Sequence, residues 1–242
     1  MPPSPSSPPL SESGSPLRLT GISSMATRAV LNELAAAYPQ PGVEVLIESV
    51  GGVDAARRVQ AGEAFDIVVL AADAIDRLIA SGQVLAGSRV DLVHSGVAVA
   101  VRGGTPWPDL GSEDAVRRAV LAAPSIGFST GPSGVALQKL FDRWGIADRI
   151  QGRLLQAPPG VPVGGLVACG QVALGFQQLS ELLNVDGIDV VGPMPPAIQI
   201  NTTFSVGLCT ASTQAPTVQG LLAFLTSPAA AVVYQRHGMT PA

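Results

Sequence analysis

The stretch APSIGFSTGPSGVALQKLFDRWG, residues 123–145, carries the pattern on which the fold depends. A short apolar run at residues 125–128 leads into a loop of Gly, Pro and small hydroxyl residues at 129–134. From Val135 to Trp144, apolar residues recur at spacings close to the helical repeat, with polar residues between them. A strand, a tight turn and an amphipathic helix are therefore predicted in that order.

The turn in this stretch is a candidate anion site. A strand-to-helix turn directs free backbone N–H groups and the positive end of the helix dipole toward one point. Glycines and short hydroxyl side chains let an anion approach closely, and the candidate contacts are Ser129, Thr130, Gly131 and Ser133. Ser and Gly are also favoured at ordinary helix caps, so the turn alone does not decide between the two interpretations.

Similar junctions recur earlier in the chain. The strand-like runs at residues 17–22, 43–49 and 65–70 each end in a small-residue turn that is followed by a helical run. The last of them, FDIVVL, is typical of a strand buried on both faces. This repeated order predicts an α/β fold with a parallel sheet, whose ligands bind at the carboxyl ends of the strands.

Two long apolar runs predict that the chain forms two lobes. Residues 92–101 and 199–210 are long for strands, and each is expected to cross from one lobe to the other. We expect lobe 1 to comprise residues 17–97 and 203–242, and lobe 2 residues 98–202. Mixed sheets flanked by helices would then enclose a cleft, which is a usual place for a small ligand.

Composition excludes several classes of partner. Of the 242 residues 47% are hydrophobic and 13% are charged, the net charge is −4, and no run of Lys or Arg occurs. Nucleic acids and acidic membranes are therefore not expected as partners. No stretch approaches the roughly 18 apolar residues of a membrane span. No metal-ligand cluster or cofactor motif is present, so neither a metal nor a cofactor is expected.

The chain begins with a segment that has little to bury. Residues 1–16 are mostly Pro and Ser and are predicted to be a disordered tail. A secretory signal has early positive charge and then an apolar core, and neither is seen here. A cytoplasmic location and a periplasmic one, with an export signal removed, both stay open. Cys169 and Cys209 lie in apolar segments and are expected to be buried free thiols rather than a disulfide.

Five segments resemble the type II periplasmic-binding-protein fold, and within it the molybdate-binding-protein-like family of ABC transporter solute-binding proteins. The resemblance covers nearly everything from Leu17 to the end, and the last segment is the most specific. The segments are LTGISS at 19–24, GVEVLIESVGG at 42–52, FDIVVLAADAIDRLIASGQV at 65–84, VACGQVALGF at 167–176 and LLAFLTSPAAAVVYQRHGMTPA at 221–242.

The resemblance also implies where a ligand is bound. It implies a hydroxyl contact from Ser23 or Ser24, a contact from the turn at Gly51 and Gly52, and a backbone contact from Ala71 or Ala72. The family has a hydroxyl in the second of these turns and a Tyr at the position of Gln178, and this chain has neither. Because an unpaired polar group costs about 1–3 kcal/mol, these differences argue against molybdate as the ligand.

The polar residues that this chain has instead favour an organic carboxylate. The side-chain amides of Gln177, Gln178 and Gln199 both donate and accept hydrogen bonds, whereas a bare oxyanion needs donors only. Arg28, Arg57 and Arg102 are candidates for a carboxylate fork, although a solvated surface position is the competing interpretation for each.

Two functions remain. The leading hypothesis is a solute-binding protein that closes its lobes on a small anion, with an ABC transporter permease as the partner that the resemblance implies. The alternative is an isomerase of an unsaturated tricarboxylate, from an aconitate-isomerase-like branch of the same fold. That reaction needs a group to move a proton, for which His94 and Glu48 are the candidates, each with a structural role as the competing interpretation.

Overall fold

The computed structural model describes residues 16–242, so the tail predicted for residues 1–16 lies, apart from Pro16, outside the described residues. The strands are β1 (Leu17–Ser24), β2 (Val43–Val50), β3 (Ile67–Ala71), β4 (Val90–Arg102), β5 (Ile126–Phe128), β6 (Leu154–Gln156), β7 (Leu174–Gln178), β8 (Ile188–Pro193), β9 (Asn201–Leu208) and β10 (Met239–Pro241). The α-helices are α1 (Arg28–Ala36), α2 (Gly52–Gln60), α3 (Ala72–Ala80), α4 (Glu113–Ala122), α5 (Pro132–Arg143), α6 (Ala147–Ile150), α7 (Val163–Ala168), α8 (Leu179–Leu182), α9 (Ala215–Leu225) and α10 (Pro228–Arg236), and three 3-10 turns, η1 (Met25–Thr27), η2 (Gln151–Arg153) and η3 (Pro196–Ile198), lie between them.

The first three strands form the parallel sheet that the sequence predicts. β1 lies between β2 and β3 and runs parallel to both, with Ser23 opposite Ser49 and Ile22 opposite Val68. The carboxyl ends of these strands therefore lie at one edge of the sheet. The turns that lead into η1, α2 and α3 begin at this edge.

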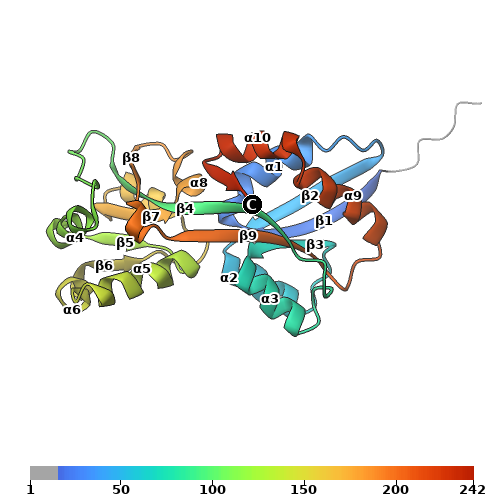
Figure 1. Ribbon diagram of the computed structural model, residues 1–242, viewed down its shortest axis with the longest axis horizontal. Coiled ribbons are helices and arrows are strands. Elements are labelled where there is room, and N and C mark those ends of the chain that lie inside the picture. The colour runs from blue at the N-terminus through green and yellow to red at the C-terminus, as the bar shows by residue number, and fades with distance from the viewer. Residues whose placement is uncertain (1–15) are drawn as a thin grey trace, which may run out of the picture.

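Two long strands join the two lobes. β4 pairs with β9 in antiparallel fashion as far as Gly96, and from Val97 onward it pairs with β7 and β8. β9 pairs with β3 along its other side. Figure 1 shows β4 and β9 running side by side through the middle of the molecule, with β1–β3 at one end and β5–β8 at the other. The predicted two-lobed α/β fold with two crossover strands is confirmed.

The second lobe has a parallel core of its own. β5 lies between β6 and β7 and is parallel to both, with Phe128 opposite Phe176. β8 is not among the strands expected from the sequence. It pairs with the outer half of β4, and the register shift between Val99 and Ala100 lies within that pairing.

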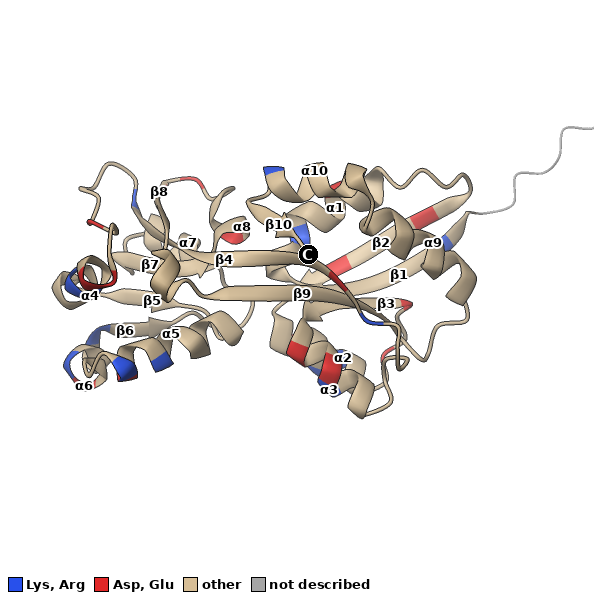
Figure 2. Cartoon of the chain, viewed as in Figure 1, with Lys and Arg blue, Asp and Glu red and all other residues tan. Residues whose placement is uncertain are grey.

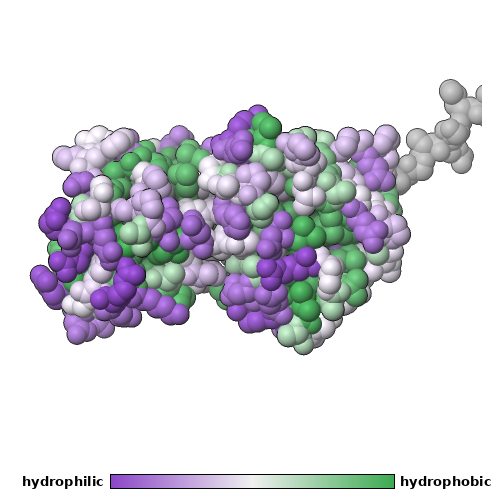
Figure 3. All heavy atoms as spheres, viewed as in Figure 1, coloured by the Kyte–Doolittle hydropathy of each residue, from purple (hydrophilic) through white to green (hydrophobic). Residues whose placement is uncertain are grey.

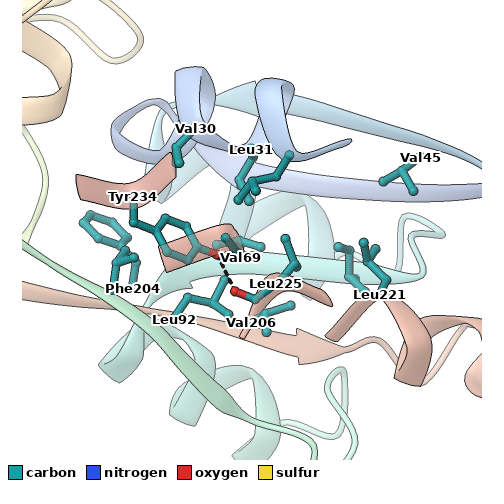
Figure 4. Close-up of a cluster of buried hydrophobic side chains, with 14 of the residues drawn as sticks. Val30, Leu31, Val45, Val69, Leu92, Phe204, Val206, Leu221, Leu225 and Tyr234 are labelled. Atoms are coloured by element: carbon teal, nitrogen blue, oxygen red, sulfur yellow. Dashed lines mark hydrogen bonds between the residues drawn. The ribbon is translucent and has the colours of Figure 1, made fainter. Parts of the chain in front are cut away.

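The largest apolar cluster lies beneath the helices of the first lobe. Leu31, Val69, Val206 and Leu225 belong to it, together with Tyr234, whose hydroxyl donates a hydrogen bond to the carbonyl of Leu225 at 2.9 Å (Figure 4). α9 and α10 therefore pack against the sheet. Within residues 16–242 no single helix is long and apolar enough to cross a membrane; α9 and α10 meet that test only together, as a pair bent by 61°.

Charged side chains of both signs lie mainly on the outer helices, such as α2 to α6, and the two crossover strands carry few of them (Figure 2).

The two cysteine thiols differ in exposure. Cys209 is buried as expected, and burial raises its pKa to about 12. The expectation of burial was wrong for Cys169, which lies exposed just after α7 because the chain turns outward there. Both cysteines are free thiols.

Candidate functional site

A pocket lies between the two lobes, at the carboxyl ends of strands from both. The molecular surface is indented between α5 and the α2–α3 pair (Figure 3). Both lobes and the second crossover strand contribute to the lining, which consists of Ser24, Met25, Ala26, Gly51, Gly52, Ser129, Thr130, Gly131, Pro132, Ser133, Pro158, Gly160, Val161, Pro162, Gln177, Gln178, Glu181, Thr202 and Phe204.

Two helices from opposite lobes begin at this pocket. α2 begins after Gly51 and α5 after Gly131, and neither helix has a side chain that caps its first turn. Among the described helices only α4 and α10, which lie elsewhere, have a capping side chain, Ser112 and Ser227, so a missing cap is not peculiar to the pocket. The first-turn amides of a helix have no partner within the helix and carry its positive dipole end. The amides at the starts of the two helices are therefore placed to attract an anion, in a pocket whose described lining has no cationic side chain.

Two buried oxygen atoms in the pocket wall have no hydrogen-bond partner within residues 16–242. They are Oγ of Ser24, a residue that is 7% exposed, and Oε1 of Gln178, a residue that is 3% exposed. The amide nitrogen of Gln178 does have a partner, since it donates to Oγ1 of Thr202 at 2.8 Å. An unsatisfied buried polar group costs about 1–3 kcal/mol, so these two atoms indicate where a polar ligand binds.

Glu181, on α8, is the one titratable side chain among the described residues that line the pocket. The backbone N–H of Gly164 donates to Oε1 of Gln177 at 3.1 Å, and this bond fixes the orientation of the Gln177 amide. Nε2 of Gln177 then donates to Oε2 of Glu181. Burial raises the pKa of Glu181 to about 7, and the hydrogen bond from Gln177 acts in the opposite direction but is the smaller effect.

Most of the predicted ligand contacts lie in this pocket. Ser24, Gly51, Gly52, Ser129, Thr130, Gly131, Ser133, Gln177 and Gln178 all line it. Ala71 lines the mouth of the cleft between α2, α3 and α5. Ser23 and Ala72 line neither, because the Ser23 hydroxyl turns toward Ser49, at 2.7 Å, and Ala72 is already the first residue of α3.

The two residues suggested for proton transfer lie outside the pocket. Both oxygens of the Glu48 carboxylate accept hydrogen bonds from Arg58, at 2.6 and 2.9 Å, and this contact lowers the pKa of Glu48. His94 is exposed on β4, and its Nδ1 lies 3.0 Å from Oγ1 of Thr203. Neither residue lines the pocket between the lobes, where the isomerase hypothesis requires a proton-transfer group.

The arginines suggested as a carboxylate fork, and Gln199, also lie elsewhere. Arg28, Arg57 and Arg102 are absent from the pocket lining, and Arg57 pairs with Asp54 at 3.2 Å. Oε1 of Gln199 accepts from the N–H of Ile200 at 2.8 Å. Over residues 16–242, no three His, Cys, Asp or Glu side chains come together as metal ligands would. Any anion here is thus held by amides and hydroxyls.

Sequence reasoning missed two polar side chains of the pocket, Glu181 and Thr202. Glu181 lies four residues after Gln177, in the short helix that follows β7, but a single Glu in a short helix usually indicates a solvated surface. Thr202 lies at the start of β9, where the alternation of buried and exposed residues is the available signal. The adjacent amides of Gln177 and Gln178 were the closest signal in the sequence that Glu181 and Thr202 belong to a polar site.

A sequence model described as "bacterial extracellular solute-binding protein" matches residues 19–240. The chain belongs to this family. One curated relative of this solute-binding protein is an aconitate isomerase from Pseudomonas sp., which is 38% identical over 230 residues, with 92% of this chain and 87% of the relative covered.

Solved structures of the same fold resemble this solute-binding protein over nearly its whole length. The periplasmic molybdate-binding protein of Azotobacter vinelandii has a TM-score of 0.76 at 20% identity, with 92% of this chain and 98% of that one covered. PEB3 of Campylobacter jejuni with bound L-phospholactate has a TM-score of 0.72 at 16% identity, with 92% and 99% covered. These likenesses confirm the expected type II periplasmic-binding-protein fold.

Proposed function

We propose that this solute-binding protein captures a small organic carboxylate in the pocket between its lobes. The observation that carries the proposal is the pair of unpartnered oxygens on Ser24 and Gln178, held between the N-termini of α2 and α5. A carboxylate on the ligand is attracted to the helix N-termini and accepts hydrogen bonds from their amides. The Ser24 hydroxyl can donate to the same ligand.

A carboxylate fits this wall better than a tetrahedral oxyanion does. A fully ionised oxyanion only accepts hydrogen bonds, so it offers nothing to Oε1 of Gln178 or to the carboxyl of Glu181 in its ionised form. An organic acid can present carbon-bound, hydroxyl or acid hydrogens as well as charged oxygens. Two of the comparisons support this choice, because aconitate is a tricarboxylate and L-phospholactate carries a carboxylate, whereas other similar structures are those of molybdate-, tungstate- and sulfate-binding proteins.

Thermal unfolding with a ligand panel tests the proposal. The panel holds cis- and trans-aconitate, citrate and malate on one side, and molybdate, tungstate and sulfate on the other. A ligand at 100 times its Kd stabilises the folded state by about 2.7 kcal/mol, which is readily measured. We expect a carboxylate to raise the Tm the most. A larger shift with any of the tetrahedral oxyanions would contradict the proposal.

The fate of the bound ligand separates two versions of the function. In the transport version, the protein hands the ligand to an ABC transporter permease. In the second version, it isomerises an unsaturated tricarboxylate, and 38% identity to an aconitate isomerase over 92% of this chain favours it. Closure of the lobes would exclude water from a proton-transfer step. Proton NMR of aconitate with the protein in heavy water distinguishes the versions, since only the second converts one isomer into the other.

A further inference from the structure

Glu181 is oriented by a chain of hydrogen bonds that begins in the backbone. Gly164, in α7, fixes the amide of Gln177, and the Gln177 amide holds Oε2 of Glu181. Oε1 of Glu181 makes no hydrogen bond among residues 16–242, and Glu181 lines the pocket. One carboxyl oxygen is therefore anchored, and the other is free to meet a ligand.

No charged side chain stabilises either protonation state of this carboxyl. In the described structure the pocket segments that surround it, 24–26, 51–52, 129–133, 158–162 and 202–204, contribute no Lys, Arg, His, Asp or further Glu to the lining. Desolvation consequently decides the balance and raises the pKa of Glu181 to about 7. The acid and its conjugate base are then both populated near neutral pH, as a group that takes up and returns a proton requires.

We propose that Glu181 is the acid–base residue of the pocket, which moves a proton between two carbon atoms of a bound unsaturated polycarboxylate. The inference rests on the proposed carboxylate ligand. It assigns a chemical role to a residue that the binding function alone does not need.

The proton transfer balances without a co-reactant. The Glu181 carboxylate takes a proton from the methylene carbon next to a ligand carboxylate, and the C–H electron pair forms a new double bond to the central carbon. The electron pair of the old double bond then takes the proton back from Glu181 at the far carbon. Both carbons flank the same central carbon, so one carboxyl group can serve both. The amides at the starts of α2 and α5 stabilise the negative charge that builds up on the ligand.

The test uses the full chain with trans-aconitate in heavy water, followed by proton NMR, together with calorimetric binding. E181Q keeps the shape and the hydrogen bond from Gln177 but cannot move the proton. We expect its Kd to stay within about threefold, while deuterium incorporation and isomerisation fall by about 10²-fold or more. E44Q is the matched control, because Glu44 lies on β2 outside the pocket lining and pairs there with Arg18 of β1, and it should behave as wild type.

Each outcome bears on a different claim. Isomerisation by E181Q at the wild-type rate would overturn the inference, and so would a wild-type protein that binds aconitate but neither isomerises it nor exchanges its carbon-bound protons, although the binding function would then stand. A wild-type protein that binds no carboxylate would overturn both. If E181Q lost its folded circular dichroism spectrum, E181D would decide, since a lower rate with a displaced pH profile supports the role and an unchanged rate and profile overturns it.

Discussion

The amide nitrogen of Gln178, at the end of β7, donates a hydrogen bond to the hydroxyl of Thr202, on β9, across 2.8 Å. Both residues are buried, and both line the pocket. The bond connects the sheet of the second lobe to a crossover strand. It also fixes the amide of Gln178 so that Oε1 is left for a ligand.

Replacing Thr202 should therefore affect both stability and binding. T202V removes the partner of the Gln178 amide nitrogen and leaves a third unsatisfied polar atom in the wall, so we expect the free energy of unfolding to fall by about 1–3 kcal/mol. Carboxylate affinity should fall too, because the amide is no longer held in place. Urea unfolding and calorimetry measure the two effects. T203V is the control, since the Thr203 hydroxyl contacts only the exposed His94, and a T202V protein indistinguishable from it would contradict the prediction.

The two adjacent serines at the end of β1 should behave in opposite ways. Ser24 Oγ has no partner in the ligand-free protein, whereas Ser23 Oγ bonds with Ser49 Oγ at 2.7 Å. S24A removes an unpaired buried hydroxyl, so it should raise the stability of the protein without ligand, and it should weaken ligand binding by about 0.5–1.5 kcal/mol, or roughly three- to tenfold. S23A should lower stability by a similar energy and leave Kd unchanged. Calorimetry and urea unfolding of both variants decide, and equal Kd values would refute a ligand contact by Ser24.

The sequence predicts those site residues whose position in the fold is set by a short local pattern. A strand that ends in small residues before a helix marks the carboxyl edge of a sheet, so Ser24, Gly51 and the turn at 129–133 were recognisable from the sequence. Their position around one pocket follows because parallel strands share that edge.

Glu181 could not be recognised as a pocket residue from local patterns, because the segments that cover it lie far apart in the chain. Residues 158–162, Gln177 and η1 surround it, and none of them is marked by the short sequence around Glu181. Glu48 failed as a candidate for a related reason. The end of a strand gives the position of a carboxylate but not its partner, and Arg58 of α2 neutralises it.

Acid should weaken the connection between the two crossover strands. The Ser205 hydroxyl, on β9, donates to Oδ1 of Asp91, on β4, at 2.6 Å. This bond, with help from Arg89, lowers the pKa of Asp91. A carboxyl whose pKa is lower in the folded state stabilises the fold above its unfolded pKa of about 3.9, and this stabilisation is lost as the pH falls through the folded value.

D91N removes this charge at every pH. We expect D91N to be less stable than wild type at pH 7, with the difference shrinking as the pH is lowered below about 4. Urea unfolding at both pH values measures it. D142N is the control, because the Asp142 carboxylate is exposed and makes no hydrogen bond or ion pair among the described residues. A difference between D91N and wild type that did not depend on pH would contradict the assigned role of the Asp91 charge.

The glycine at position 134 should be needed for the shape of the pocket. A Cβ atom there would lie 1.9 Å from the carbonyl oxygen of Ser129 and 2.9 Å from its carbon, and both are backbone atoms that cannot rotate away. Ala is normally the better helix residue by about 1 kcal/mol, so a loss of stability in G134A would report this clash directly. We expect the Tm of G134A to fall. Ligand affinity should fall with it, because Ser129 and Ser133 are displaced. Thermal unfolding and calorimetry of G134A should be compared with G152A, whose added Cβ meets no atom within 4 Å. A G134A protein as stable as G152A would show that the turn can widen at no cost.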